Sequence, residues 1–305
     1  MPSLTNEAVD IAIDPERGGK ITSLRDRRSG RQWLLTPAKQ SGPPAGYGRA
    51  FVEEELSGWD EMLPTILACE IPGEQGAVAL PDHGEVWSVP WKITAQSASA
   101  ISLSARARRW SVEIERTVEL GDTDGVRLYY RVTNHAQRQV PVLWAAHPQF
   151  LWRPGSRVQL PASVDTVLDV TSRPEPFETP WRAPLDRLPD HLEVGRGHKS
   201  WTLPGQRPSW ARLLDADGAS VTLSFDPDVL PYVGVWSDAC AYAAQPTVAI
   251  EPSTGFYDDL SAAVKTGRVP WLAPREVLAW TVGVTLAPPD PERGAGHHAL
   301  LPERR

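Results

Sequence analysis

Three short polar segments of this chain carry side chains that could perform acid–base chemistry. They contain His83, His147 and Glu251. Each lies beside a Pro or a Gly, and the apolar runs before His147 and Glu251 predict strands that end there. A His and a Glu that converge from separate strands can give a proton to one oxygen while removing a proton from another. A paired acid and base is therefore the first chemistry that the sequence suggests.

Glu251 follows an apolar run and precedes Pro252, which predicts a position at a sheet rim or in a groove. Partial burial would raise the pKa of its carboxyl above the usual value of about 4.3. His147 precedes Pro148, and an imidazole with an ordinary pKa near 6.5 can donate or accept a proton close to neutrality. Taken singly, Glu251 could equally form a rim salt bridge, and His147 or His83 could be a structural histidine.

The elements that must position these groups are predicted to be strands. Residues 110–118 and 126–132 alternate apolar and polar side chains on either side of a Gly-bounded turn at 121–125, which predicts a hairpin. Further strands are expected at 9–13, 20–25, 101–107, 140–146, 219–225, 232–236, 246–251 and 277–286. Residues 258–267 are the best helix candidate, because an Asp begins the segment and a Gly ends it.

The 30 Pro and 23 Gly residues are spread along the chain, which favours a single all-β domain over residues 1–286. Residues 171–208 are rich in Pro and show no periodicity, so this segment is expected to be a long excursion over one face or a partly mobile loop. Residues 287–305 are expected to form a flexible tail. His297 and His298 belong to that tail and receive no role.

Composition excludes several classes of function. The net charge of −7 and the absence of a Lys/Arg stripe argue against a nucleic-acid partner. The densest basic group, Arg106–Arg109, is interpreted as a solvated strand face, with phosphate recognition as the alternative. Cys69 and Cys240 are far apart in the sequence and follow no pattern, so they predict neither a disulfide framework nor a zinc site. No phosphate-binding glycine loop, nucleophile elbow or His-Glu-x-x-His motif occurs.

The chain shows neither a secretory signal at its N-terminus nor a run of about 20 apolar residues that could span a membrane. The expectation is a cytoplasmic protein without a membrane partner. Thirteen tryptophans are the compositional outlier. Most are expected in the core, but indole also stacks on the apolar faces of sugar rings, which hints at a carbohydrate ligand.

In combination, these motifs resemble the aldose 1-epimerase (galactose mutarotase-like) superfamily, and especially its divergent members. The resemblance runs from about Ile11 to Leu286. It is carried by Gly18-Gly-Lys-Ile-Thr-Ser-Leu24, Ser29-Gly-Arg-Gln-Trp-Leu-Leu35, Gly58-Trp-Asp-Glu-Met-Leu-Pro64, His83-Gly84 with Trp87 and Trp91, His147-Pro148-x-Phe150, and Ile250-Glu251-Pro-x-x-Gly255. Each motif is weak alone, but the order His, His, Glu along the chain agrees with the family.

The resemblance implies a β-supersandwich, in which large antiparallel sheets pack face to face and a curved groove holds a monosaccharide or small sugar. It also implies an isomerase that interconverts anomers. Glu251 would take the proton of the anomeric hydroxyl and His147 would protonate the ring oxygen, which opens the pyranose. His83 would hydrogen-bond a hydroxyl or the ring oxygen. Mutarotation already proceeds in water, so such groups suffice without a metal or cofactor.

Candidate residues for contact with the sugar are Arg49, Trp59, Asp60, Trp87, Trp152, Trp236 and Asp238. The chain departs from the family pattern where members often carry an Arg after the Leu/Phe-Pro stretch, since Pro64 is followed by Thr-Ile-Leu-Ala-Cys69. Arg49 is a possible replacement. The stretch 58–61 is also richer in carboxylates than expected, and neither galactose nor glucose can be assigned as the substrate.

Two other functions fit the same residues. One is a carbohydrate-binding protein on this fold whose acid–base pair is idle, since fold does not determine function. The other is a sugar-phosphate mutarotase in which Arg49 or Arg106–Arg109 holds the phosphate. A glycoside hydrolase or lyase is disfavoured, because no second catalytic carboxylate can be placed.

Overall fold

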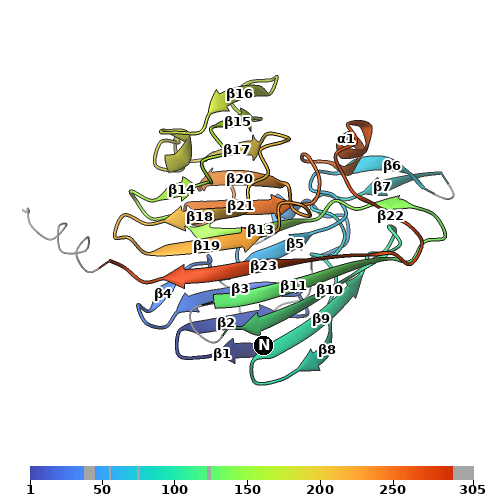
Figure 1. Ribbon diagram of the computed structural model, residues 1–305, viewed down its shortest axis with the longest axis horizontal. Coiled ribbons are helices and arrows are strands. Elements are labelled where there is room, and N and C mark those ends of the chain that lie inside the picture. Colours follow the sequence, from blue (N-terminus) through green and yellow to red (C-terminus); the bar gives the residue numbers. More distant parts are fainter. Residues whose placement is uncertain (38–44, 55, 74–75, 122–124, 291–305) are drawn as a thin grey trace, which may run out of the picture.

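The computed structural model describes residues 1–290 apart from 38–44, 55, 74–75 and 122–124. The described chain consists mainly of strands in two large sheets, and neighbouring strands within each sheet are antiparallel (Figure 1). The prediction of an all-β fold of large antiparallel sheets with few short helices is therefore confirmed. Residues 291–305, with His297 and His298, lie outside the described residues.

The larger sheet has the strand order β1-β2-β3-β5-β13-β21-β20-β17-β15-β16, with β4 paired to β3. Its strands are β1 (Ser3–Thr5), β2 (Val9–Asp14), β3 (Lys20–Asp26), β4 (Arg31–Gln32), β5 (Trp59–Met62), β13 (Ala145–Leu151), β15 (Thr166–Asp169), β16 (Phe177–Pro180), β17 (Arg196–Thr202), β20 (Tyr232–Ala239) and β21 (Thr247–Ser253).

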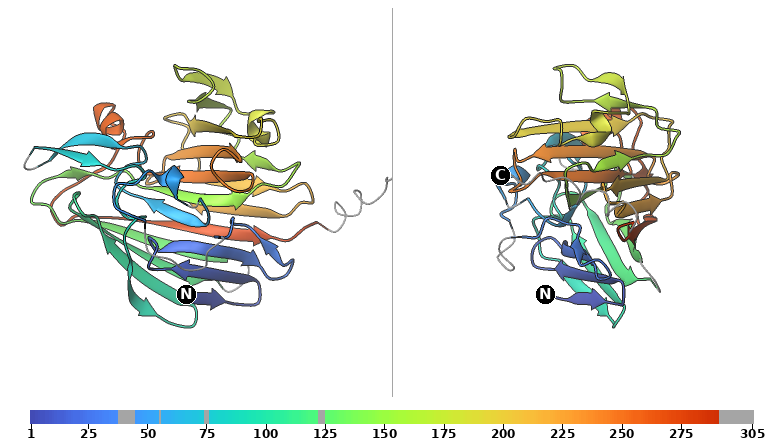
Figure 2. Two further views of the ribbon diagram at one scale, coloured as in Figure 1. Left: turned by 180° about the vertical axis from the view of Figure 1, so that it is seen from behind. Right: turned by 90° about the vertical axis from the view of Figure 1, so that its left-hand side faces the viewer.

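The smaller sheet has the order β14-β18-β19-β23-β11-β10-β9-β8 and lies across the larger one, as the two views of Figure 2 show. Its strands are β8 (Lys92–Gln96), β9 (Ala100–Arg106), β10 (Val112–Leu120), β11 (Gly125–Asn134), β14 (Arg157–Gln159), β18 (Trp210–Leu214), β19 (Ser220–Phe225) and β23 (Val277–Ala287). Short pairs are formed by β6 (Cys69–Gly73) with β7 (Gly76–Leu80), and by β12 (Val140–Pro141) with β22 (Trp271–Leu272).

Three short helical elements complete the described fold: η1 (Phe51–Glu53), η2 (Leu185–Arg187) and α1 (Leu260–Lys265). The helix predicted over 258–267 is α1. Its N-cap is Asp259, whose side chain accepts a hydrogen bond from the backbone N–H of Ala262 at 2.7 Å. None of the described helices combines the length and the apolar character needed to cross a bilayer.

The hairpin predicted from alternation is β10 and β11, which pair from Val112–Asn134 to Leu120–Val126. Alternate residues of both strands are buried, as a sheet with one face in the core requires. The other predicted strands agree with β2, β3, β9, β19, β20, β21 and β23 within a few residues.

Two predictions about elements are wrong. The strand predicted over 140–146 is only β12 at its start, and the next strand, β13, begins at Ala145 and continues through His147 to Leu151. The segment 171–208 is not a simple excursion, because β17 lies inside the larger sheet between β20 and β15.

The two faces of the larger sheet have different surroundings. Glu61 on β5 faces the smaller sheet, because its carboxylate accepts a hydrogen bond at 2.7 Å from Arg116 on β10. Side chains alternate between faces along a strand, so its neighbour Asp60 points to the opposite face. His147 pairs with Asp60 in the β5–β13 register and therefore shares that outer face.

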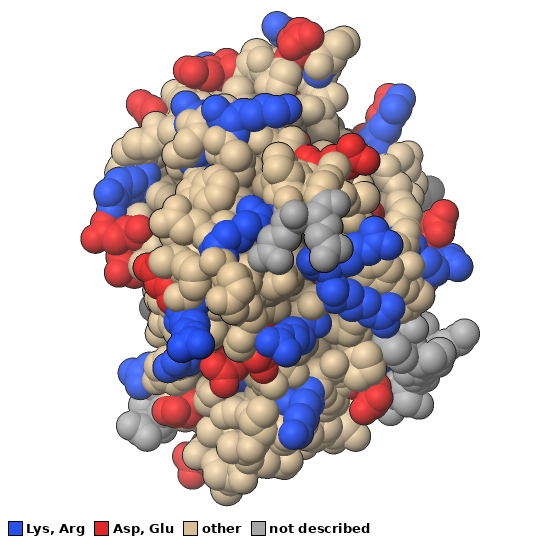
Figure 3. All heavy atoms as spheres, turned by 90° about the vertical axis from the view of Figure 1, so that its right-hand side faces the viewer, with Lys and Arg blue, Asp and Glu red and all other residues tan. Residues whose placement is uncertain are grey.

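Figure 3 shows the side of the molecule that carries α1, β6, β7 and β22 in Figure 1. Basic and acidic side chains are interspersed there with uncharged surface rather than gathered into one band of a single sign.

Candidate active site

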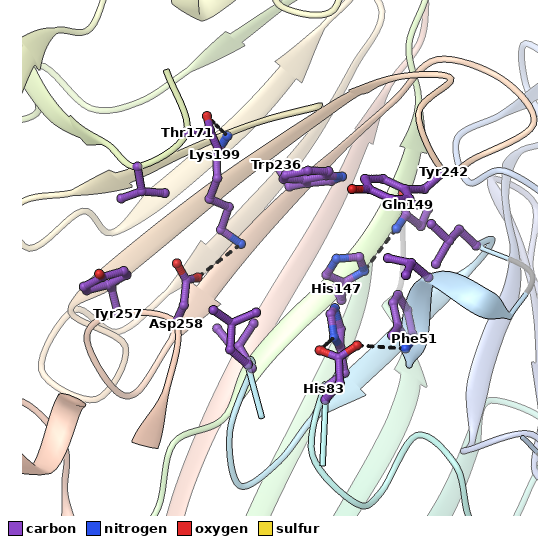
Figure 4. A pocket seen from close by; sticks show the side chains of 16 residues that line it. Phe51, His83, His147, Gln149, Thr171, Lys199, Trp236, Tyr242, Tyr257 and Asp258 are labelled. Carbon is purple, nitrogen blue, oxygen red and sulfur yellow. Dashed lines mark hydrogen bonds and ion pairs between the residues drawn. The ribbon is translucent and has the colours of Figure 1, made fainter. Parts of the chain in front are cut away.

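A cavity of about 420 Å³ lies on the outer face of the larger sheet (Figure 4). Its floor comes from β13, β17 and β20, and its walls come from η1 and from the loops after β5, β7, β20 and β21. The lining residues are Phe51, Val52, Leu56, Ile66, Leu67, Asp82, His83, His147, Gln149, Val170, Thr171, Lys199, Trp236, Tyr242, Tyr257 and Asp258.

His147 and Glu251 are directly opposite each other on neighbouring strands. The β13–β21 register pairs Ala145 with Ser253 and Gln149 with Ala249, and counting two residues inward from either pair places His147 against Glu251. Cross-strand neighbours of this kind have side chains within contact distance. Nε2 of His147 is 3.8 Å from Oε1 of Glu251.

The expectation that both residues sit at strand ends is wrong. His147 lies in the middle of β13, and Glu251 lies inside β21. Pro148 and Pro252 do interrupt hydrogen bonding, because no β13–β21 pair is recorded between Ala145–Ser253 and Gln149–Ala249. The strands continue because β13 still pairs with β5 and β21 still pairs with β20 there.

Glu251 is fully buried beneath the cavity floor. Its Oε2 forms an ion pair with Nζ of Lys199, and its Oε1 has no hydrogen-bond partner within the described part of the chain. Burial raises the pKa of Glu251 above its ordinary value, and the positive charge of Lys199 opposes that rise. Gly234 makes room for the carboxylate, since a Cβ there would lie 3.0 Å from Oε2.

The surroundings of His147 favour its neutral form. Burial lowers its pKa well below 6.5, and the nearby positive charges of Lys199 and Lys20 act in the same direction. The amide nitrogen of Gln149 lies 3.2 Å from Nδ1. An amide nitrogen only donates, so Nδ1 accepts and the ring proton is on Nε2, the atom that faces Glu251.

His83 lines the cavity from the loop after β7. It lies within a turn in which Gly84 N–H donates to the Pro81 carbonyl at 3.0 Å, and Gly84 is required because a Cβ would lie 2.1 Å from the Leu63 carbonyl oxygen. The His83 ring stacks on Phe51 with 3.9 Å between ring centroids, and its centroid is 5.2 Å from that of His147. Both imidazoles therefore belong to one site.

The carboxylate of Asp82 fixes the His83 ring. Oδ1 of Asp82 is 2.9 Å from Nδ1 of His83, and its Oδ2 accepts the backbone N–H of Phe51 at 2.8 Å. Burial opposes ionisation of Asp82, but the hydrogen bonds from His83 and Phe51 hold its pKa below the ordinary value. An ionised Asp82 makes Nδ1 of His83 the donor and leaves its Nε2 for a ligand.

Lys199 and Asp258 also belong to the site, and sequence reasoning missed both. Nζ of Lys199 is 3.9 Å from Oδ1 of Asp258. Asp258 accepts a hydrogen bond from the indole N–H of Trp201 at 3.0 Å. Burial raises the pKa of Asp258, with Lys199 opposing the rise. In the sequence, Lys199 lies in the segment without periodicity, and Asp258 resembles a helix cap.

Of the residues predicted to contact a sugar, Trp236 lines the cavity. Its ring is half-buried and lies beside Tyr242, with ring centroids 5.9 Å apart (Figure 4). Asp238 lies two residues further along β20 but is fully buried, and its carboxylate accepts backbone N–H groups, including that of Ala243 at 2.7 Å. Asp238 therefore shapes the loop that carries Tyr242.

The other predicted contacts lie outside the cavity lining. Asp60 is fully buried and forms an ion pair with Lys20 at 2.9 Å, and Trp59 is buried beside it. Trp152 donates its indole N–H to Asp190 at 2.7 Å.

Of the last two predicted contacts, Trp87 supports the site and Arg49 lies away from it. Trp87 packs edge-on against Phe51, with ring centroids 5.0 Å apart, and its indole N–H donates to the Asp82 carbonyl, so it supports the wall of the cavity. Arg49 is exposed and pairs with Glu53 and Glu54 at 3.2 and 3.0 Å.

The described residues contain no group of three or more His, Cys, Asp or Glu side chains arranged to hold a metal ion. The acid, base and hydrogen-bonding groups in and beneath the cavity include a carboxylate with one oxygen that lacks a hydrogen-bond partner in the described part of the chain, two imidazoles and an ammonium group.

Comparisons with known proteins give one family match. The model of the family described as aldose 1-epimerase matches residues 71–226, just over half of the chain. The match includes His83, His147 and Lys199, whereas Glu251 follows it. No protein in the curated set matches the chain by sequence.

Solved structures share the fold at low sequence identity. The Slr1438 protein from Synechocystis sp. PCC 6803 superimposes with a TM-score of 0.73 at 16% identity, over 94% of this chain and 95% of that one. A putative aldose 1-epimerase from Escherichia coli K12 gives 0.70 at 15%, over 93% and 98%. A galactose mutarotase-like protein from Lactobacillus casei ATCC 334 gives 0.67 at 16%, over 94% and 100%.

Proposed function

The chain belongs to the aldose 1-epimerase family, and on that premise we propose that it interconverts the anomers of an aldose by acid–base opening and closure of the sugar ring. The observation that carries the proposal is the cross-strand pair of His147 and Glu251, whose Nε2 and Oε1 atoms are 3.8 Å apart at the base of a sugar-sized cavity. A general base and a general acid placed on two oxygens of one ring suffice for this reaction.

In the opening step, Oε1 of Glu251 takes the proton of the anomeric hydroxyl. The bond between the anomeric carbon and the ring oxygen breaks, and the ring oxygen takes a proton from Nε2 of His147, which enters the step as the imidazolium and leaves it as the neutral imidazole. The product is the open-chain aldehyde. Rotation about the bond next to the carbonyl carbon presents its other face, and the reverse proton transfers close the ring as the opposite anomer.

The buried setting favours the opening step. His147 and Glu251 lie close enough to titrate as a coupled pair. The reactive arrangement has an imidazolium and a carboxylate, and the step converts both to neutral groups. Burial disfavours both charged forms, as the lowered pKa of His147 and the raised pKa of Glu251 indicate. Proton transfer through the sugar therefore relieves a desolvation cost.

The remaining cavity residues have supporting roles in this proposal. His83, with Nδ1 held by Asp82, presents Nε2 to a sugar hydroxyl or the ring oxygen. Trp236 and Tyr242 offer an aromatic surface for the apolar face of the sugar. No step requires a metal or a redox cofactor.

Anomer exchange can be tested by NMR saturation transfer on a panel of unphosphorylated aldoses with the wild-type protein, Glu251→Gln and His147→Ala. The expected result is exchange with at least one aldose that each variant slows by roughly 10²-fold or more. Wild-type rates equal to those of both variants on every sugar would remove the enzymatic proposal. Calorimetric binding of a sugar without exchange would instead favour the carbohydrate-binding alternative.

The charge of the cavity favours an unphosphorylated sugar. Among the described lining residues, Lys199 is the single Lys or Arg, and it already faces two carboxylates. Arg49 is paired with glutamates outside the lining, and Arg108 and Arg109 lie against the ring of Tyr47. We therefore expect no gain in affinity for a hexose 6-phosphate over the free hexose.

A further inference from the structure

The acid–base pair of His147 and Glu251 does not by itself explain why a lysine is buried beside it. It projects from β17 into the cavity and is only 8% exposed. Its ammonium group lies between Glu251 and Asp258 and 5.1 Å from the ring centroid of Trp201 (Figure 4 shows the contact with Asp258). A lysine is rarely buried unless it is paired, so this ammonium group is held by the two carboxylates.

The two carboxylates act on each other as well as on the lysine. Asp258 raises the pKa of Glu251 through like-charge repulsion, whereas Lys199 lowers it. The strands set this arrangement. Lys199 pairs with Trp236 across β17–β20, and Gly234 on the same face pairs with Glu251 across β20–β21. The ammonium group thus reaches over the glycine to the base.

We propose that Lys199 is a positioning residue that holds Glu251 as the carboxylate; this inference rests on the proposed function. Only the charged form of Glu251 can accept the anomeric proton, whereas burial favours the neutral form. An adjacent cation restores the charged form, since an opposite charge at contact distance stabilises a carboxylate.

The geometry gives Lys199 and Asp258 opposite effects. Removal of the ammonium group leaves Glu251 buried near a second carboxylate with no compensating charge, so Glu251 is protonated up to a higher pH. Removal of the Asp258 charge leaves Lys199 to Glu251 alone, so Glu251 is ionised at a lower pH. A residue with a merely structural role would not produce shifts of opposite sign.

The test uses Lys199→Met, Lys199→Arg and Asp258→Asn in the full-length protein. In the pH profile of kcat/KM, the acidic limb is expected to move up by about one to three pH units in Lys199→Met. It should move down in Asp258→Asn, and Lys199→Arg should stay near the wild type because the positive charge is kept. Lys20→Met is the matched control for the ionisation of Glu251, since it also removes a buried ammonium–carboxylate pair but the pair is with Asp60, and the Lys20 charge acts on His147 rather than on Glu251.

A second readout separates this inference from the proposed function. The Glu251 carboxyl can be titrated by ¹³C NMR in glutamate-labelled protein, with Glu251→Gln to assign the signal. Its midpoint should shift as the acidic limb does, even if no aldose is found to be a substrate. An unchanged midpoint in Lys199→Met would overturn the inference. If the only effect of Lys199→Met is a higher KM for anionic sugars, the inference is also overturned, because Lys199 would then be a ligand for substrate.

Discussion

Thr247 on β21 donates its hydroxyl hydrogen to Oε1 of Gln149 at 3.0 Å, which orients the amide so that its nitrogen faces Nδ1 of His147. Three side chains thus form a chain of hydrogen bonds beside the cavity. The chain fixes the neutral tautomer with its proton on Nε2. For His147 to carry a second proton, the Gln149 amide must turn over, with the Thr247 hydroxyl then accepting from the amide nitrogen.

Gln149→Leu is expected to lower kcat for anomer exchange by roughly fivefold, the equivalent of one hydrogen bond of about 1 kcal/mol. Without the amide, neither the tautomer nor the orientation of His147 is held. The ¹⁵N shifts of the imidazole should show a mixture of tautomers. Thr247→Val is the control, since it keeps the amide and removes only its anchor, and it should have a smaller effect. A single Nε2–H tautomer in Gln149→Leu would contradict this account.

Burial of neutral His147 makes folding stability depend on pH. Below pH 6.5 the unfolded chain takes up a proton on this side chain, whereas the folded chain does so only at a lower pH, because its pKa is lowered. The unfolded state then binds more protons, so stability falls as the pH falls. The loss attributable to His147 is about 1.4 kcal/mol at one pH unit below 6.5.

Chemical denaturation at pH 7.5 and 5.5 measures this effect, with His147→Gln as the comparison. The variant has no group that titrates there, so its stability should change less between the two pH values than that of the wild type. Equal changes in both proteins would mean that His147 is not the group responsible.

Gly197 sets the position of the Trp236 ring. A Cβ at residue 197 would lie 2.4 Å from Cη2 of Trp236, so Gly197→Ala must displace the indole. If the ring stacks on the sugar, KM should rise by roughly two- to tenfold, matching about 0.5–1.5 kcal/mol for an aromatic contact. The value of kcat should change little, because the acid–base pair is on other strands.

A double-mutant cycle with Trp236→Ala provides the control for Gly197→Ala. Once the indole is absent, the added methyl group has nothing to displace, so the double variant should match Trp236→Ala alone. Additive effects of the two substitutions on KM would show that Gly197→Ala acts through the backbone instead.

The sequence was sufficient to predict strands whose faces differ in polarity. In β10, Val112, Ile114 and Val118 are buried as the alternation predicts, because one face of that strand packs in the core. The same rule fails for β17, where His198, Lys199 and Ser200 are consecutive polar residues and are all buried. One face of that strand carries Lys199 into the cavity, so hydrophobic periodicity carries no signal there.

The prolines led to a wrong prediction of where His147 and Glu251 lie in their strands. Pro148 and Pro252 predicted that strands end beside His147 and Glu251, but each removes only the hydrogen bonds between β13 and β21. The outer neighbours β5 and β20 hold both strands in the sheet. The chemistry could be read from residue types and the family resemblance, whereas the direct opposition of His147 and Glu251 required the register.

The acidic stretch 58–61, unexpected from the family pattern, is explained by two buried ion pairs. Asp60 pairs with Lys20 on the cavity side, and Glu61 pairs with Arg116 on the core side. Arg116 interrupts the apolar face of β10, and no other signal in the sequence linked it to Glu61. Because packing fixes the strands that carry Glu61 and Arg116, this core pair should contribute to stability and not to catalysis.

Glu61→Gln tests that assignment. Glu61 also accepts hydrogen bonds from the Tyr130 hydroxyl and the Trp144 indole N–H, both at 2.9 Å, and Glu61 and Arg116 are fully buried. The substitution leaves the guanidinium charge of Arg116 uncompensated, so the free energy of unfolding should fall by about 3–5 kcal/mol. Tyr130→Phe, which removes one hydrogen bond and keeps the ion pair, should cost about 1 kcal/mol. Denaturant titration measures both losses.

Because the fully buried pair faces the smaller sheet, anomer exchange by the folded fraction of each variant should match the wild type. A selective loss of kcat in Glu61→Gln would instead tie this carboxylate to the reaction.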